Sequence, residues 1–156
     1  MRLFHTASFP VIDALPDVAD AAVLRDKQRD RLVLTWEERR WLRGRFATQM
    51  GRTVAIALPT GTLIDPGRVI FVADEWYLTI EAASEPLLAV HLPDRQQAIL
   101  AAFEVGNLHF PLAIDGDYLL VPDDSAMVQL LGRLRLSWER RLASFQPTGK
   151  GQPHGF

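Results

Sequence analysis

The 156-residue chain contains no cysteine, and this absence excludes several kinds of site. Without thiols the protein has no disulfide framework, no thiolate metal centre and no cysteine nucleophile. An excess of charge is missing too, since 17 basic side chains stand against 19 acidic ones for a net charge of −2. Phosphate binding needs a clear basic excess on one face, so the sequence argues against nucleic acid as a partner.

Long hydrophobic runs are also absent. The first residues, Met1–His5, show no basic region followed by an apolar run, so no signal peptide is evident. No apolar stretch approaches the roughly 20 residues that span a bilayer. We therefore expect a cytoplasmic protein with no membrane partner. Hydrophobic residues still make up 48% of the chain, enough for a packed core.

Recognisable catalytic motifs are missing as well. No serine lies in a nucleophile-elbow context, and the glycines at 60–62 and 149–151 fall short of a phosphate-binding loop. The paired carboxylates Asp123 and Asp124 are better explained as helix caps. We therefore expect that the chain is not an enzyme.

The first half of the chain predicts a small β-rich domain, residues 1–83. Short apolar segments are separated by Gly/Pro turns, at residues 32–36, 53–58, 62–64, 69–72 and 76–80. Thr35–Glu38 leaves two interpretations open. It fits a capping box that begins a helix with a basic face of Arg39, Arg40, Arg43 and Arg45. We favour the alternative, a solvated charged stretch within a β domain.

The second half, residues 84–144, predicts the order β-α-β-β-α-β. Strands are expected at 87–90, 110–114, 118–121 and 134–138, with a hairpin turn at 115–117. The first helix begins after Asp94 and ends near Gly106, with Ile99, Leu100, Phe103 and the alanines as its apolar face. The second places Met127, Leu130 and Leu131 inward and ends at Gly132. The fold class is α+β: a β-rich domain, a ferredoxin-like domain, and a flexible Gly/Pro-rich tail, residues 145–156.

Four histidines are the main candidates for transition-metal ligands. His109 follows the first helix of the second domain, where a lone histidine more often has a structural role at the helix end than a ligand role. His154 lies in the tail, while His91 and His5 carry no ligand pattern. No two histidines have close ligand spacing, so one chain supplies too few donors for a metal centre. A residue near a twofold axis occurs twice, so a metal site here requires a dimer.

An ordered set of short segments resembles a known family. The chain resembles the urease accessory protein UreE family, which carries nickel. The resemblance rests on Glu38-Arg39-Arg40 with the following arginines, on the segments at 54–63 and 81–88, on Gly106-Asn107-Leu108-His109-Phe110-Pro111, and on Phe145-Gln146-Pro147 with Gly149. The order and spacing of these segments are specific, although each segment alone is weak.

This resemblance implies a nickel metallochaperone. It implies an N-terminal domain for protein contacts, and a homodimer joined through the C-terminal domains. His109 would meet its symmetry mate to share one nickel ion, with His154 as a further ligand. Zinc or copper would also bind in vitro. The implied partners are a urease accessory GTPase and the urease apoprotein complex.

The chain departs from the family pattern at two positions, where Leu108 replaces an arginine and Glu104 a common histidine. Its tail holds one histidine, so storage of several ions is not expected. Two rivals remain. A metal-independent interaction module would dock on urease through the β domain alone. An RNA-binding ferredoxin-like domain would need aromatic motifs on its middle strands, and these strands have none.

Overall fold

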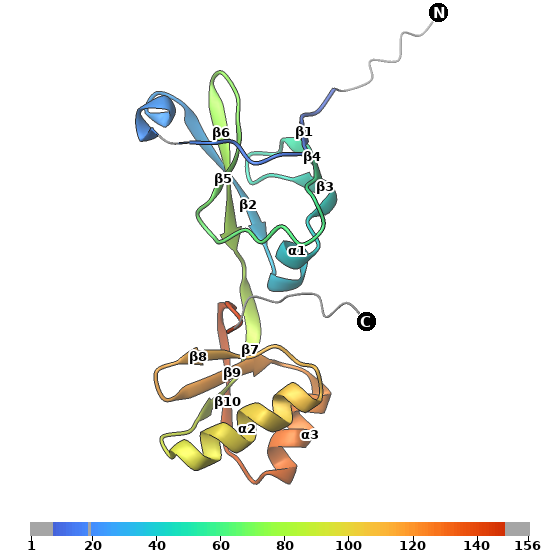
Figure 1. Cartoon of the computed structure of the whole chain (residues 1–156), viewed down its shortest axis with the longest axis vertical. Coiled ribbons are helices and arrows are strands. Elements are labelled where there is room, and N and C mark those ends of the chain that lie inside the picture. Colours follow the sequence, from blue (N-terminus) through green and yellow to red (C-terminus); the bar gives the residue numbers. More distant parts are fainter. Residues whose placement is uncertain (1–7, 19, 149–156) are drawn as a thin grey trace, which may run out of the picture. The chain divides into compact units, whose positions relative to one another are not determined.

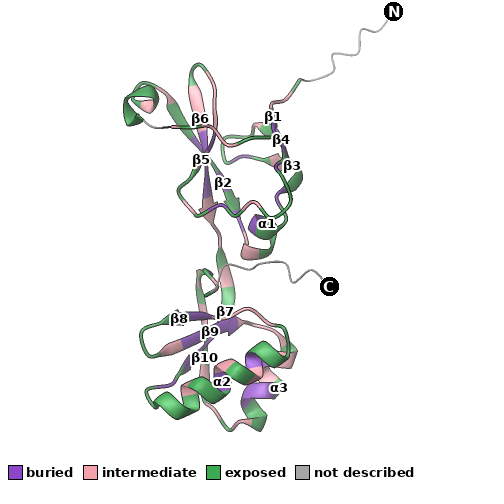
Figure 2. Ribbon diagram, in the orientation of Figure 1, coloured by how far each residue is buried: buried purple, intermediate pink, exposed green. Residues whose placement is uncertain are grey.

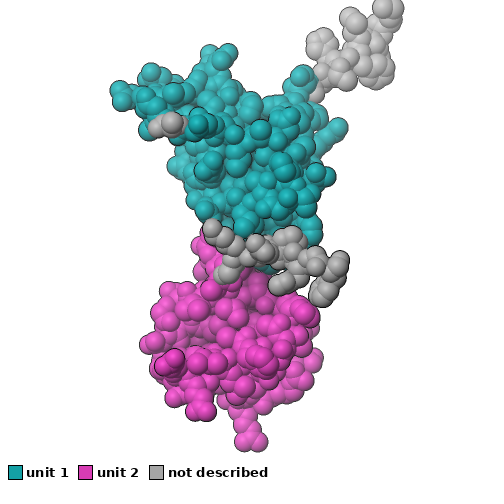
Figure 3. Space-filling model, viewed as in Figure 1, with its two compact units in different colours: residues 1–82 teal, residues 83–156 magenta. Residues whose placement is uncertain are grey.

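The computed structural model describes residues 8–18 and 20–148 (Figure 1). The chain divides into two compact units, residues 1–82 and 83–156 (Figure 3). The first unit contains β1 (Val11–Ile12), the 3-10 helix η1 (Ala21–Leu24), β2 (Gln28–Leu34), α1 (Trp36–Arg40), β3 (Arg43–Ala47), β4 (Thr53–Ala57), β5 (Val69–Val72) and β6 (Trp76–Ala82). The second contains β7 (Ser84–His91), α2 (Arg95–Asn107), β8 (Ala113–Asp115), β9 (Tyr118–Pro122), α3 (Ser125–Arg133) and β10 (Trp138–Ser144).

The first unit is built from two three-stranded sheets, in the orders β1-β4-β3 and β2-β6-β5. Along β2, Leu32 and Leu34 are buried while Arg31 and Val33 are exposed, as the period of two in a half-buried strand requires. Both sheets contribute to one apolar core, which includes Leu32, Val54, Ile56, Ile70, Leu78 and Ile80. The predicted β-rich first half is confirmed.

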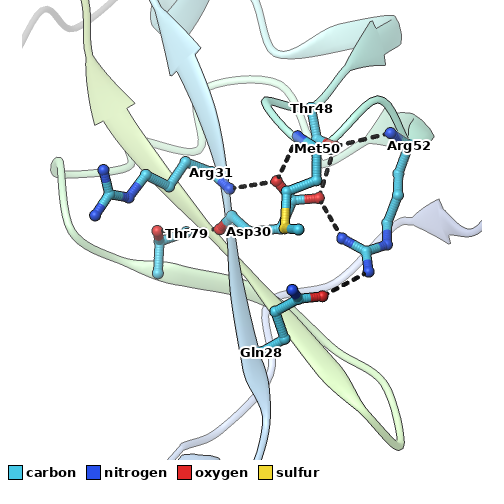
Figure 4. Close-up of polar contacts among 7 residues, drawn as sticks. All are labelled: Gln28, Asp30, Arg31, Thr48, Met50, Arg52 and Thr79. Carbon is cyan, nitrogen blue, oxygen red and sulfur yellow. Dashed lines mark hydrogen bonds and ion pairs between the residues drawn. The ribbon is translucent and has the colours of Figure 1, made fainter.

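A buried carboxylate ties β2 to the turn between β3 and β4 (Figure 4). Asp30 is 1% exposed, and it accepts hydrogen bonds from the Thr48 hydroxyl (2.6 Å) and the Arg52 guanidinium (2.8 Å). The backbone amides of Arg31 and Met50 also donate to it. Burial raises the pKa of Asp30, but these hydrogen bonds outweigh burial and hold the pKa below its ordinary value. No local sequence pattern predicted this network.

The segment at 35–40 is a helix, so the favoured prediction of a charged stretch without a helix is wrong. Thr35 accepts a hydrogen bond from the Glu38 amide, and the Glu38 carboxylate accepts one from the Thr35 amide. This capping box stabilises both ends of the first turn. The predicted basic helical face is also wrong, because Arg39 is buried and both Arg43 and Arg45 belong to β3.

The second unit is the predicted ferredoxin-like fold. Its sheet has the order β10-β7-β9-β8 with antiparallel neighbours. Residues that share one face, among them Leu88, Val90 and Val121, pack in one core with Val105 of α2 and Met127 of α3. Figure 1 shows the two helices together on that side of the sheet. The inward placement of Met127, Leu130 and Leu131 is confirmed.

Several predicted strand boundaries are wrong. Residues 62–64 are not a strand, because the chain between Pro59 and Gly67 turns twice, with hydrogen bonds from the Thr62 amide to Pro59 and from the Arg68 amide to Asp65. The second strand of the ferredoxin-like unit begins only at Ala113, and the last at Trp138. In both places the residues that were expected to begin the strand belong to the connection that follows a helix, since α2 ends at Asn107 and α3 at Arg133.

The expected apolar face of α2 is reversed. Ile99, Leu100 and Phe103 are 60%, 52% and 62% exposed, whereas the residues that α2 buries are the smaller Ala101 and Val105. Both sets follow helical spacing, and they lie on opposite sides of the helix. On the side of α2 that faces the sheet, the helix packs so closely that it buries only these smaller side chains.

Candidate metal site

His109 lies directly beyond the C-terminal end of α2. Asp94 begins this helix by accepting a hydrogen bond from the Gln97 amide (2.9 Å), and the helix ends at Asn107 with Leu108 as its cap. The His109 side chain is exposed. An exposed imidazole on a helix end has a free ring nitrogen for a metal, in contrast to a histidine held in a core.

The backbone at His109 has a left-handed conformation, with φ of 60°. The His109 amide donates to Gly106 O (2.9 Å) and the Phe110 amide to Val105 O (3.3 Å). These two bonds form a Schellman motif, in which glycine is the usual left-handed residue because it has no Cβ. A histidine at this position therefore costs stability that a glycine would save.

The end of α3 repeats this arrangement. Arg135 has φ of 55°, its amide donates to Gly132 O, and the Leu136 amide donates to Leu131 O. The residues at 106–110 and 132–136 share the pattern glycine, any residue, leucine, basic residue, apolar residue. This short internal repeat was not predicted from the sequence. Arg135 thus provides a backbone match for His109 without an imidazole.

An exposed apolar stripe runs along α2 toward His109. Ile99, Leu100 and Phe103 line an open groove of about 750 Å³, together with Asp94, Arg95 and Gln96 at the beginning of the helix. Figure 2 shows α2 mostly exposed along the outer side of the second unit. Three adjacent large apolar side chains at this exposure are more than the scattered surface apolar residues of a monomer.

Of the other three histidines, only His91 lies within the described residues. It stacks on Tyr118 at the end of β7, with ring centroids 5.0 Å apart. His5 and His154 lie outside the described residues. Within residues 8–18 and 20–148 no three metal-ligating side chains lie together, so the described part of one chain does not form a metal centre around His109. Similarly, no described helix is long and apolar enough to cross a bilayer.

The segment after β10 returns to the strand that follows His109. β10 and β8 are opposite edges of the sheet, yet the Thr148 amide donates to Leu112 O (2.7 Å). Residues 145–148 therefore cross the sheet from one edge to the other, with Phe145 buried to 1% exposure. This hydrogen bond brings Thr148 close in space to the segment that follows His109, although the two are far apart in sequence.

Comparison with known proteins places both units in one family. The model of the UreE urease accessory protein, N-terminal domain, matches residues 11–83. The model of the UreE urease accessory protein, C-terminal domain, matches residues 85–155. Each match covers nearly one whole unit, and the two follow each other in the family's order.

Individual relatives agree with this match. Urease accessory protein UreE of Cupriavidus pinatubonensis is 33% identical over 139 residues, which cover 86% of this chain and 62% of the relative. The UreE protein of a Synechococcus strain is 32% identical over 75% of this chain and 78% of its own length. That of Cupriavidus necator is 32% identical over 83% and 69%. The chain therefore spans about two thirds of the length of these relatives. It belongs to the UreE family of urease accessory proteins, which are accessory proteins and not enzymes.

Proposed function

We propose that the protein is a cytoplasmic nickel carrier that works as a homodimer and supplies nickel for urease assembly. Its second unit binds the metal, with His109 from two chains as the central ligands. The exposed imidazole beside the apolar stripe of α2 is the observation that carries this proposal. The cargo is passed to a partner GTPase and the urease apoprotein; the family description supports urease as the destination.

The dimer follows from two needs of a single chain. Ile99, Leu100 and Phe103 expose apolar surface that water solvates poorly, and a second copy of α2 would cover it. His109 lies just beyond the C-terminal end of the same helix, so a twofold axis near the end of α2 would bring two imidazoles together. One interface thereby buries the apolar stripe and doubles the number of ligands.

His154 can serve as a further ligand by its distance along the chain. It lies six positions (154 − 148) after Thr148, and an extended chain covers at most about 3.6 Å per residue, roughly 20 Å in all. Thr148 is bonded to Leu112, which lies three positions (112 − 109) after His109. The two histidines are therefore joined by a path short enough for both to reach one ion.

The chemistry of such a site suits transfer. Imidazole nitrogen is a common ligand of nickel, zinc and copper, and the absence of cysteine removes the thiolate ligands that would favour copper(I). Two imidazoles with tail and water ligands hold an ion less firmly than a closed protein cage does. A carrier needs this, because the acceptor must be able to take the ion. Zinc or copper would also bind in vitro, since divalent copper forms stronger complexes than nickel.

The test compares His109→Gly with Arg135→Gly. Both substitutions place glycine at the left-handed residue of a Schellman motif, but only the first removes an imidazole. Nickel is titrated into each variant by calorimetry, and the mass of each species is measured by light scattering. We expect one high-affinity nickel ion per dimer in the wild type and in Arg135→Gly, and its loss in His109→Gly. Equal nickel affinity in all three would refute the proposed His109 site, and a wild type that binds no nickel would leave a metal-independent interaction module.

A further inference from the structure

Several arginines on the surface of the first unit form no ion pair within the described residues, and three of them lie close together in the sequence. Arg29, Arg31, Arg52, Arg140 and Arg141 all pair with carboxylates. Arg40, Arg43 and Arg45, which lie in α1 and β3, do not. The Arg40 guanidinium instead lies 5.4 Å from the rings of both Trp36 and Trp41, and that of Arg45 lies 4.7 Å from the ring of Phe9. Stacking keeps these cations in place without neutralising them.

Aromatic surface accompanies this charge. Trp41 directly follows α1 and is 61% exposed, although tryptophan has the largest side chain of all residue types. It lines an open cavity of about 510 Å³ with Thr35, Glu37, Glu38, Arg43 and Phe46. Tryptophan and arginine are the residues most enriched where proteins bind each other tightly. We call Arg40, Trp41, Arg43 and Arg45 the α1–β3 surface.

The strand of this surface has an open edge. In the sheet order β1-β4-β3, β3 is a terminal strand, and no other described strand pairs with its outer side (Figure 1). Arg43 and Arg45 alternate with Gly44 and Phe46 along it, so the two arginines share one face. An extended peptide can add to such an edge through backbone hydrogen bonds, with side-chain contacts giving specificity.

We propose that the α1–β3 surface binds an extended acidic segment of a partner protein, added as a strand beside β3. This deepens the proposed role of the first unit in protein contacts. Carboxylates of the segment pair with Arg43 and Arg45, and an apolar side chain packs on Trp41. Charged residues also guard open edges against unspecific pairing. Here the same two cations repel basic segments and attract acidic ones. Their charge therefore both protects the open edge from unspecific pairing and selects acidic partners.

The charges of the cavity favour a peptide over a nucleic acid. Glu37 and Glu38 line the cavity beside Arg43, and their carboxylates repel a continuous chain of phosphates. A peptide carries its charges singly and can place them away from these glutamates. The surface therefore suits a segment with spaced acidic residues.

The experiment uses the full chain in EDTA, so that its outcome does not depend on nickel. The probe is a fluorescein-labelled eight-residue peptide of alternating glutamate and valine, measured by fluorescence anisotropy at physiological salt. A peptide with lysine in place of glutamate tests the charge. We expect the acidic peptide to bind and the basic one to bind at least tenfold more weakly. Binding of both peptides alike, or of neither, would overturn the proposal.

Variants assign the binding to the surface. Arg43→Glu with Arg45→Glu, and separately Trp41→Ala, should each weaken the acidic peptide at least tenfold. Arg25→Glu with Arg68→Glu, also exposed and in the first unit, is the charge-matched control and should bind as the wild type does. Circular dichroism and thermal melting verify that each variant is folded. Unchanged binding in the Arg43/Arg45 variant would refute the proposal.

Two other occupants have their own outcomes. Tighter binding of an RNA oligomer than of the acidic peptide would identify a nucleic-acid surface and reject the acidic segment. A change in oligomeric state in the Arg43/Arg45 variant would identify a second copy of the chain as the occupant. Nickel binding is measured in parallel, so a failure here is distinguishable from a failure of the nickel-carrier proposal.

Discussion

Replacing His109 by glycine should make the fold more stable while it removes the proposed metal ligand. At φ of 60°, the imidazole-bearing residue occupies a conformation that costs an L-residue about 1–2 kcal/mol. Glycine avoids this cost but loses about 0.4–1 kcal/mol through the greater freedom of the unfolded chain. The balance favours glycine by about 0.5–1 kcal/mol. In a unit of this size, that corresponds to a rise in Tm of roughly 2–8 °C.

The two Schellman motifs allow this magnitude to be checked internally. Arg135 has φ of 55° and the same pair of backbone hydrogen bonds, so Arg135→Gly should give a similar rise. Arg133 lies in the last turn of α3 as well and stays in place, so the favourable charge at that helix end is only partly lost. His109→Ala should instead lower stability relative to glycine, because alanine has the same difficulty at positive φ.

The assay is chemical denaturation of metal-free protein at neutral pH, followed by circular dichroism, for the wild type and the three variants. Metal must be absent because a bound ion would stabilise the wild type selectively. A fall in stability for His109→Gly would refute the reasoning, since it would mean that the His109 side chain makes contacts worth more than the backbone strain. A rise for Arg135→Gly alone would refute it equally for the metal-site position.

Four further outcomes are expected. Phe103→Asp should weaken the proposed dimer by roughly 30-fold or more in sedimentation equilibrium, because a central aromatic anchor contributes about 2 kcal/mol or more. Leu142→Asp is the control, since Leu142 is also exposed but lies on β10, and it should not weaken the dimer. Dimers of unchanged affinity in Phe103→Asp would exclude α2 as the interface. Asp30→Ala should lower the free energy of unfolding by about 2–4 kcal/mol, because it leaves the buried Thr48 hydroxyl and the Arg52 guanidinium without their acceptor. Because folding lowers the pKa of Asp30, the ionised carboxylate stabilises the fold above the ordinary pKa of 3.8, and this stabilisation is lost as the pH falls through the pKa of the folded state. The free energy of unfolding in urea should therefore fall less between about pH 4 and 3 for Asp30→Asn than for the wild type. A chain ending at Thr148 should remain dimeric but bind nickel more weakly in calorimetry, and unchanged affinity would remove His154 from the ligand set.

Local signals in the sequence were most reliable where one chemical cause acts alone. Asp94 and Asp124 cap α2 and α3 as predicted, since a carboxylate before a helix satisfies amides wherever the helix lies. The turn at 115–117 likewise follows from Gly116, which adopts the positive φ that a tight hairpin needs. Both helix ends were predicted at glycines, yet the left-handed residues are His109 and Arg135, since the packing of Phe110 and Leu136 near the core sets where each helix stops.

The order of elements and the division into a β-rich and a ferredoxin-like part were determined by the sequence, because periodicity and turns are properties of the chain itself. The choice of His109 as the candidate ligand came from the family resemblance of its segment. The tertiary structure alone decided which face of α2 is buried. Two apolar faces on one helix compete for the core, and only the space above the sheet selects Ala101 and Val105 and leaves Ile99, Leu100 and Phe103 outside. It also brought Thr148 to Leu112 across the sheet, a contact between residues far apart in sequence that no local pattern encodes.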